Sequence, residues 1–145
     1  MAGCLISAKL WLLGLDAQGR PMWRHDATIR VDDGMVAQIG AFEAVAYGVD
    51  LPHYGDARGV ALPFFAPPSG LAGRFGGMAG RLTPGSPAHV ALFPADGPPP
   101  SREALSSAGA QVFLDGRPAE GNALRGLLDG PETPAEAAVW AAAKR

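Results

Sequence analysis

Frequent glycine and proline residues restrict this chain to short segments of regular structure. The 145 residues include 20 glycines and 14 prolines, yet 48% of all residues are hydrophobic and the formal net charge is only -2. A disordered chain typically carries more charge and fewer apolar residues. The composition therefore predicts a folded chain with many turns between short strands, and its length predicts a single domain over residues 1–145.

The clearest local signal lies at residues 32–34, which read Asp-Asp-Gly between two runs of apolar and β-branched residues. This pattern predicts a tight β-hairpin, because glycine adopts a positive φ without strain. A second hairpin is predicted around the Asp-Gly at residues 115–116. We further expect strands at residues 4–13, 58–62 and 89–93, a short helical piece at 101–107, and either a short helix or an irregular segment at 42–49.

The C-terminal residues 133–145 predict a helix. Thr133-Pro134-Ala135-Glu136 has the pattern of a capping box with proline at the first helical position. Two roles are open for this helix, docking on the sheet or association with another chain. Trp140 is accordingly either a core residue or an interface anchor, whereas Trp11 in the first strand is expected in the core.

Two blocks of sequence carry a more specific pattern. The first covers residues 5–63 and ends in the segments DDGMVAQIG and DARGVALP; the second covers residues 80–119 and contains GRLTPGSPAHVALF and VFLDGRP. Together these blocks resemble the N- and C-terminal flanks of the amidohydrolase superfamily of metal-dependent hydrolases. In that superfamily the flanks form a small β-sandwich beside a catalytic (β/α)₈ barrel. The resemblance implies a mainly β fold, a β-sandwich or open barrel, to which the predicted short C-terminal helix is added.

The catalytic barrel has no counterpart in this chain. Such a barrel needs roughly 200 or more residues, whereas here residues 69–80, five of them glycine, separate the two blocks. We interpret residues 69–80 as a flexible connector in place of the barrel. The resemblance also implies that Ser69 and Leu71 stand where the superfamily has the two histidines of a His-x-His metal motif. Neither side chain is an imidazole ligand, so we predict no catalytic residue, no metal site and no cofactor.

The remaining reactive side chains favour structural roles. His25, His53 and His89 lie in separate segments without the short spacing of a metal site, and His89 replaces an aspartate of the superfamily pattern. Cys4 is the only cysteine, which excludes an intrachain disulfide and fits a reducing compartment. Because it lies in an apolar strand, we interpret Cys4 as structural rather than as a nucleophile.

The composition also limits the partners. The near-neutral charge without a basic stripe argues against nucleic acid, and the apolar run at residues 10–15 is too short to span a bilayer. We predict a cytoplasmic and, from the abundance of alanine, glycine and arginine, bacterial protein. Phe64 and Phe65 remain apolar where a relative would enter its barrel, so they and Trp140 are the candidate interface residues. The expected partner is a second copy or a separate chain.

Three functions are compatible with these observations. The first hypothesis is a non-catalytic binding or assembly module that resembles the β-sandwich flank of amidohydrolases. The second is a small enzyme, or an enzyme subunit, whose site is completed at an oligomer interface. The third is the sandwich half of a split metal-dependent hydrolase whose barrel is encoded separately.

Overall fold

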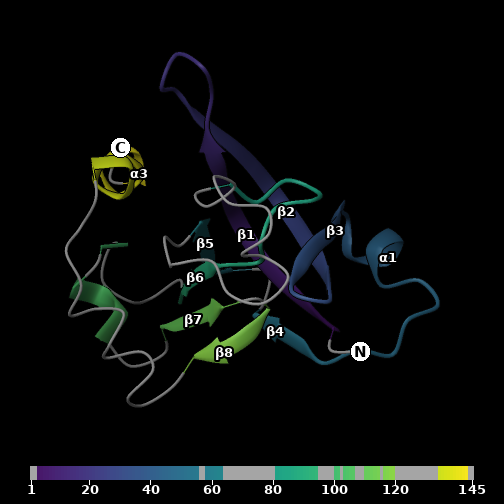
Figure 1. The fold of residues 1–145 in the computed structure, drawn as a ribbon. Coiled ribbons are helices and arrows are strands. Elements are labelled where there is room, and N and C mark those ends of the chain that lie inside the picture. The colour runs from purple at the N-terminus through teal and green to yellow at the C-terminus, as the bar shows by residue number, and fades with distance from the viewer. Residues whose placement is uncertain are drawn as a thin grey trace.

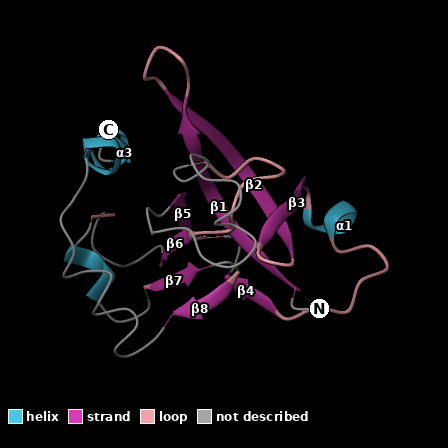
Figure 2. Ribbon diagram, viewed as in Figure 1, coloured by secondary structure: helices cyan, strands magenta, loops and turns pink. Residues whose placement is uncertain are grey.

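The computed structural model describes residues 3–55, 58–63, 81–94, 100–101, 103–106, 110–114, 116–119 and 134–143. Strands dominate these residues, as Figure 2 shows. The elements in chain order are β1 (Gly3–Leu15), β2 (Pro21–Asp32), β3 (Met35–Gly40), α1 (Phe42–Val45), β4 (His53–Gly55), β5 (Val60–Pro63), β6 (Val90–Phe93), the 3₁₀ turn η2 (Glu103–Ser106), β7 (Gln111–Leu114), β8 (Arg117–Ala119) and α3 (Pro134–Ala143) (Figure 1). The predicted mainly β fold with a C-terminal helix is confirmed.

All eight strands belong to one open sheet in the order β3-β2-β1-β5-β6-β7-β8, with β4 paired to β1. The free edge of β3 is covered by the chain that leads into β6. Gly85 N donates to Val36 O and Val36 N donates to Ser86 O, each over 2.8 Å, and Ala88 N donates to Gly34 O over 2.9 Å. These hydrogen bonds hold the segment before β6 alongside β3, while the sheet itself is not closed.

Both predicted Asp-Gly hairpins are present. Between β2 and β3, Asp33 and Gly34 have φ angles of 50° and 80°, the paired left-handed conformation of the turn that matches strand twist. Between β7 and β8, Gly116 has a φ of 75°. The longer β1–β2 hairpin projects beyond the rest of the sheet in Figure 1, and its tip is fixed by Asp16 Oδ1, which accepts from the backbone N–H groups of Gln18 and Arg20.

The two sequence blocks meet at the β5–β6 ladder. Strand β5 pairs parallel with β1 on one edge and antiparallel with β6 on the other, where Pro63 lies opposite Val90 and Val60 opposite Phe93. The residues of these four-residue strands are largely buried. The last described residue of the first block is therefore held by the second block, within one sheet.

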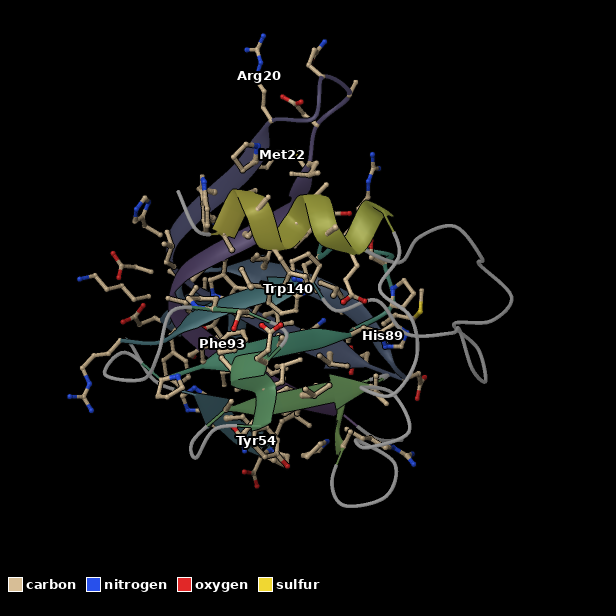
Figure 3. All side chains as sticks on the ribbon, turned by 90° about the vertical axis from the view of Figure 1, so that its left-hand side faces the viewer. Arg20, Met22, Tyr54, His89, Phe93 and Trp140 are labelled. Carbon is tan, nitrogen blue, oxygen red and sulfur yellow. The ribbon has the colours of Figure 1, made fainter. Side chains whose placement is uncertain are left out.

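The core forms two clusters, one of which lies under the C-terminal helix. Trp11 is fully buried, and its Nε1 donates to Ala27 O over 2.8 Å, so its predicted core role is confirmed. Trp140 is 5% exposed and meets Phe93 edge to face, with ring centroids 6.1 Å apart. Figure 3 shows Trp140 between α3 and the sheet. The helix thus docks on the sheet, and the Trp140 side chain fills the chain's own core.

The structure also contains the helical segments that the sequence suggested. The segment at residues 42–49 contains a one-turn helix, α1. The predicted helical piece after residue 101 is the turn η2, where Ala104 N donates to Ser101 Oγ over 3.1 Å. Helix α3 begins at Pro134 as expected, while Thr133 of the capping box lies outside the described residues. No helix among the described parts of the chain is long and apolar enough to cross a membrane.

Candidate functional site

A hollow of about 500 Å³ lies on the outer face of the sheet, where β1 and β2 run beside α1 and β4. We call it the outer hollow. Its described lining residues are Ser7, Ala8, Asp26, Ala27, Thr28, Ala41, Phe42, Glu43 and His53. A hollow of this size lies within the range of small-molecule sites, and its lining combines apolar, hydroxyl, imidazole, aromatic and carboxylate groups.

The floor of the outer hollow is a chain of three hydrogen-bonded side chains. Ser7 on β1 lies directly opposite Thr28 on β2, and adjacent strands present paired residues on one face. Ser7 Oγ lies 2.6 Å from Thr28 Oγ1 and 2.7 Å from His53 Nε2. Ser7 is 8% and Thr28 2% exposed, whereas His53 reaches towards solvent. The floor is therefore rigid at its base and open at its imidazole end.

Strand β4 brings the imidazole to this floor. It pairs parallel with β1, so that His53 lies beside Leu5 and Gly55 beside Ser7. Gly55 has a φ of 78°, and a Cβ at this position would collide with the Ser7 backbone oxygen. Only glycine combines this conformation with so close an approach. Gly55 therefore holds β4 against β1 and positions His53 next to the Ser7 hydroxyl.

Helix α1 supplies the aromatic wall of the outer hollow. The Phe42 ring stacks on the His53 ring, with centroids 5.0 Å apart and an angle of 27° between the planes. Phe42 remains 44% exposed, while Val45, one turn later, is buried against the sheet. The short helix is thus anchored by Val45 and leaves an aromatic ring available beside the imidazole.

Two carboxylates line the same hollow. Glu43 lies in the first turn of α1, and Asp26 lies within β2 with a φ of 51°. A left-handed residue inside a strand is unfavourable for most side chains and least so for Asn and Asp. On the neighbouring strand the ladder is also irregular, because the N–H groups of Lys9 and Leu10 both donate to Gly59 O. The kink at Asp26 therefore coincides with a break in β1 pairing.

Chemically, this arrangement can bind and orient a small polar group. Hydroxyl and imidazole side chains both donate and accept hydrogen bonds, whereas ionised carboxylates only accept. None of the described lining residues is lysine or arginine. Among the described residues, no group of three or more His, Cys, Asp or Glu side chains is arranged to hold a metal ion.

The candidate residues predicted from the sequence do not lie together in the structure. His25 lies exposed on β2, and His89 is 3% exposed just before β6, so of the three histidines only His53 lines the outer hollow. Phe64 and Phe65 lie outside the described residues, as do the connector at 69–80 and the positions of the absent His-x-His motif.

Cys4 has the environment of a structural thiol. It is 2% exposed, and its Sγ donates to Gly116 O over 3.3 Å. Burial raises its pKa from 9.0 to about 11, because desolvation disfavours the thiolate. A thiol that stays protonated is a poor nucleophile, which supports the structural interpretation.

Sequence reasoning did not find the outer hollow. Its signal in the sequence is weak: Ser7 and Thr28 are polar residues inside otherwise apolar strand segments, Leu5-Ile6-Ser7-Ala8 and Ala27-Thr28-Ile29. A buried hydroxyl in such a place needs a hydrogen-bond partner, and each residue provides one for the other. His53 lies 46 positions from Ser7 along the chain, and only the parallel β1–β4 pairing connects them.

The described part of the chain is thus a mainly β structure with one open sheet and a hollow of mixed polarity beside β1 and β2. No protein-family model and no curated protein matches it. Among solved structures, a weak similarity is found to the aminofutalosine deaminase of Helicobacter pylori, an enzyme of the amidohydrolase superfamily. The TM-score is 0.35 at 19% identity, over 46% of this chain and 16% of that enzyme. A TM-score of this size does not establish a shared fold, and the matched part is a small fraction of the enzyme.

Proposed function

We propose that this chain is a non-catalytic binding module, derived from the β-rich flank of an amidohydrolase-like enzyme, whose ligand occupies the outer hollow. The observation that carries the proposal is the preformed floor, in which Thr28, Ser7 and His53 are joined by hydrogen bonds of 2.6 and 2.7 Å. Small-molecule sites are typically concave and largely preformed, with a few polar groups that orient the ligand. The outer hollow has each of these properties.

The sheet topology supports a self-contained module. The β5–β6 ladder joins the two sequence blocks, and Leu62 and Ala91 on these strands are fully buried in the cluster that α3 completes. Both blocks thus contribute to the same core. A unit with its own core can fold without an inserted domain, which is what a barrel-free binding module requires.

The environment of Ser7 favours binding over catalysis. Ser7 lies inside a long strand and is only 8% exposed. Its hydroxyl contacts Thr28 as well as His53. Catalytic nucleophiles need access to the substrate and a base that is free to take the proton. A hydroxyl held between two partners is better suited to fixing the geometry of a binding surface.

Fragment screening by ¹H–¹⁵N NMR tests the proposal. Fragments that bind should shift the amide signals of Ala8, Phe42 and His53 together. The variant Ala41→Leu, which fills the outer hollow from an exposed position, should abolish these shifts. Ala44→Leu, on an exposed part of α1 outside the lining, is the matched control and should retain them. Binding that is confined to other surfaces, or equal in the two variants, would contradict the proposed site.

A small enzyme is the second candidate, and one observation favours it. The 2.7 Å separation of Ser7 Oγ and His53 Nε2 is the distance expected of a nucleophile and its general base. A fluorophosphonate probe distinguishes the two functions, because it modifies activated serines. A binding module should remain unlabelled, whereas stoichiometric labelling that is lost in Ser7→Ala would establish the enzyme.

The proposed module also associates with a second copy of the chain or with another protein. Phe42 and Tyr47 are 44% and 87% exposed large hydrophobic residues near α1, and Phe64 and Phe65 are apolar in sequence. Exposed apolar surface of this kind favours contact with a partner. Light scattering behind a sizing column should give a mass above the 14.9 kDa of one chain. A mass of one chain, unchanged by Phe64→Asp and Phe65→Asp, would rule out self-association through these residues.

A further inference from the structure

The outer hollow has a distinct charge. Its two acids, Asp26 and Glu43, come from different elements, and His53 is the only other ionisable residue in the described part of the lining. The side chains of Lys9 and Arg24 are exposed on the neighbouring strand positions but are not among the lining residues. The described lining thus carries two carboxylates and no lysine or arginine, a balance that favours a cationic ligand over an anionic one.

The Phe42 ring, which forms the aromatic wall of the outer hollow, also attracts positively charged groups. One face of the Phe42 ring covers His53, and the residue remains 44% exposed. The face of an aromatic ring carries partial negative charge and attracts ammonium and guanidinium groups. Phe42 and Glu43 are consecutive residues of α1, so the ring and a carboxylate are presented by the same turn of helix.

The hydroxyl floor is compatible with a ligand that donates hydrogen bonds. When the Nε2 atom of His53 is the acceptor, Ser7 donates to His53 and Thr28 donates to Ser7. Both hydroxyl hydrogens are then used within the floor, so the two hydroxyl groups offer a ligand only oxygen lone pairs. An ammonium group has three donors and no acceptor, which complements two hydroxyl oxygens and two carboxylates.

From these features, and on the basis of the proposed function, we infer that the outer hollow binds the ammonium group of a small organic amine. The hollow of about 500 Å³ is much larger than a single metal ion, and most of its lining surface is apolar, with Ala41 among the exposed residues that contribute to it. An amine with a short hydrocarbon chain suits both the volume of the hollow and its apolar lining. Its ammonium group lies by the carboxylates and the Phe42 ring, and its hydrocarbon chain lies against the apolar part of the lining.

Three isosteric probes test the charge. Butylammonium, 1-butanol and butyrate are titrated at millimolar concentration while the signals of Phe42 and His53 are followed by NMR. Butylammonium should shift both residues saturably, and the other two probes should not. Nα-acetyl-lysine methylamide is titrated in parallel: tighter binding of this probe would assign the ammonium group to the lysine side chain of a partner and overturn the free amine.

A matched pair of aspartates tests the position of the charge. Asp26 and Asp33 both have left-handed backbone, with φ angles of 51° and 50°, and asparagine tolerates this conformation. Asp26→Asn should weaken butylammonium binding roughly threefold to fivefold, near the upper limit for an exposed charge. Asp33→Asn removes the same charge outside the hollow and should leave the affinity within about twofold. Equal weakening in both variants would overturn the inference.

The outcomes separate the inference from the proposed function. Saturable binding of 1-butanol or butyrate in the hollow would overturn the amine inference and leave the binding module standing. If neither these probes nor any fragment of the screen binds there, both fail. Preference for butylammonium with the predicted effect of Asp26→Asn supports both together.

Discussion

Two regions of the molecule carry an aromatic pair next to a glutamate, and they differ in whether the chain covers that pair. Under α3, Phe93 and Trp140 meet edge to face, and Trp140 Nε1 donates to Glu136 Oε2 over 3.0 Å. In the outer hollow, Phe42 stacks on His53 and Glu43 follows in sequence. Trp140 is 5% exposed and Phe42 44%. Similar side chains thus complete a core in one region and remain available to a ligand in the other.

Figure 1 shows how the two helices produce this difference: α3 and α1 lie on opposite sides of the view. Helix α3 has ten residues and buries Val139, Trp140 and Ala142. Helix α1 has four residues and buries only Val45. A single turn cannot cover the face on which it lies, so a hollow remains beside it. The length of the covering helix, more than the type of aromatic residue, separates the closed region from the open one.

The largest expected effect comes from truncation in the closed region. Trp140→Ala should lower the free energy of unfolding by about 3–5 kcal/mol, because it removes a buried aromatic ring and leaves a cavity. Phe42→Ala in the open region should cost less than about 1 kcal/mol. Urea unfolding followed by circular dichroism measures both. Similar losses in the two variants would mean that the aromatic ring in the hollow is as much a part of the core as Trp140.

Glycine substitutions should give the second-largest loss of stability, and they test how closely β4 lies against β1. Gly55→Ala should cost about 2–4 kcal/mol, because it combines an unfavourable left-handed backbone with a collision against the Ser7 backbone oxygen. Gly19→Ala is the control: its φ of 79° is nearly the same, but no atom lies within 4 Å of the added Cβ. It should cost about 1–2 kcal/mol. Equal losses of stability in the two variants would show that the close β1–β4 contact does not restrict the residue at position 55.

A smaller effect is expected for the hydroxyl floor. Ser7→Ala should destabilise the chain by about 1–3 kcal/mol, since Thr28 Oγ1 loses a partner at a buried position. The double variant Ser7→Ala with Thr28→Val should cost less than the sum of the single variants, because neither polar group is then left unsatisfied. Thermal unfolding of the four proteins completes the cycle. Strict additivity would indicate that the two hydroxyls do not interact.

The smallest effect concerns the buried thiol and appears only at high pH. The pKa of Cys4 is raised in the folded chain, so its protonated form favours folding below pH 9. As the pH rises from 9 towards 11, the unfolded thiol ionises first and stability should fall by about 1–2 kcal/mol. Cys4→Ala should lack this dependence in urea unfolding between pH 8 and pH 11. An identical pH profile in both proteins would contradict the raised pKa.

The closed region was easier to predict from sequence than the open one. Pro134 as the first helical residue, followed by alanine-rich sequence, indicated α3, and Asp-Gly pairs indicated the hairpins at Gly34 and Gly116. These are local signals, in which one or two residues favour one backbone conformation. Trp140 remained undecided between core and interface, because its burial depends on where the helix docks.

The open region depends on pairings that local sequence does not encode. Strand β4 has three residues, His53-Tyr54-Gly55, and the structure pairs it parallel to a strand nearly fifty residues earlier. So short a segment has too few positions for an alternating pattern. Ser7 and Thr28 become neighbours only through the β1–β2 register. The outer hollow is therefore a product of tertiary structure, and its residues were not recognisable as a set.

A crystal structure grown with butylammonium chloride tests most directly whether the outer hollow is a binding site that the chain leaves open. Electron density for the ligand is predicted in the hollow, with its ammonium nitrogen near Asp26 and Glu43 and its hydrocarbon chain against the apolar part of the lining. The Ser7–Thr28 and Ser7–His53 hydrogen bonds should be retained. A hollow filled by the side chains of α1 or β4, with Phe42 buried like Trp140, would contradict the distinction between the two regions.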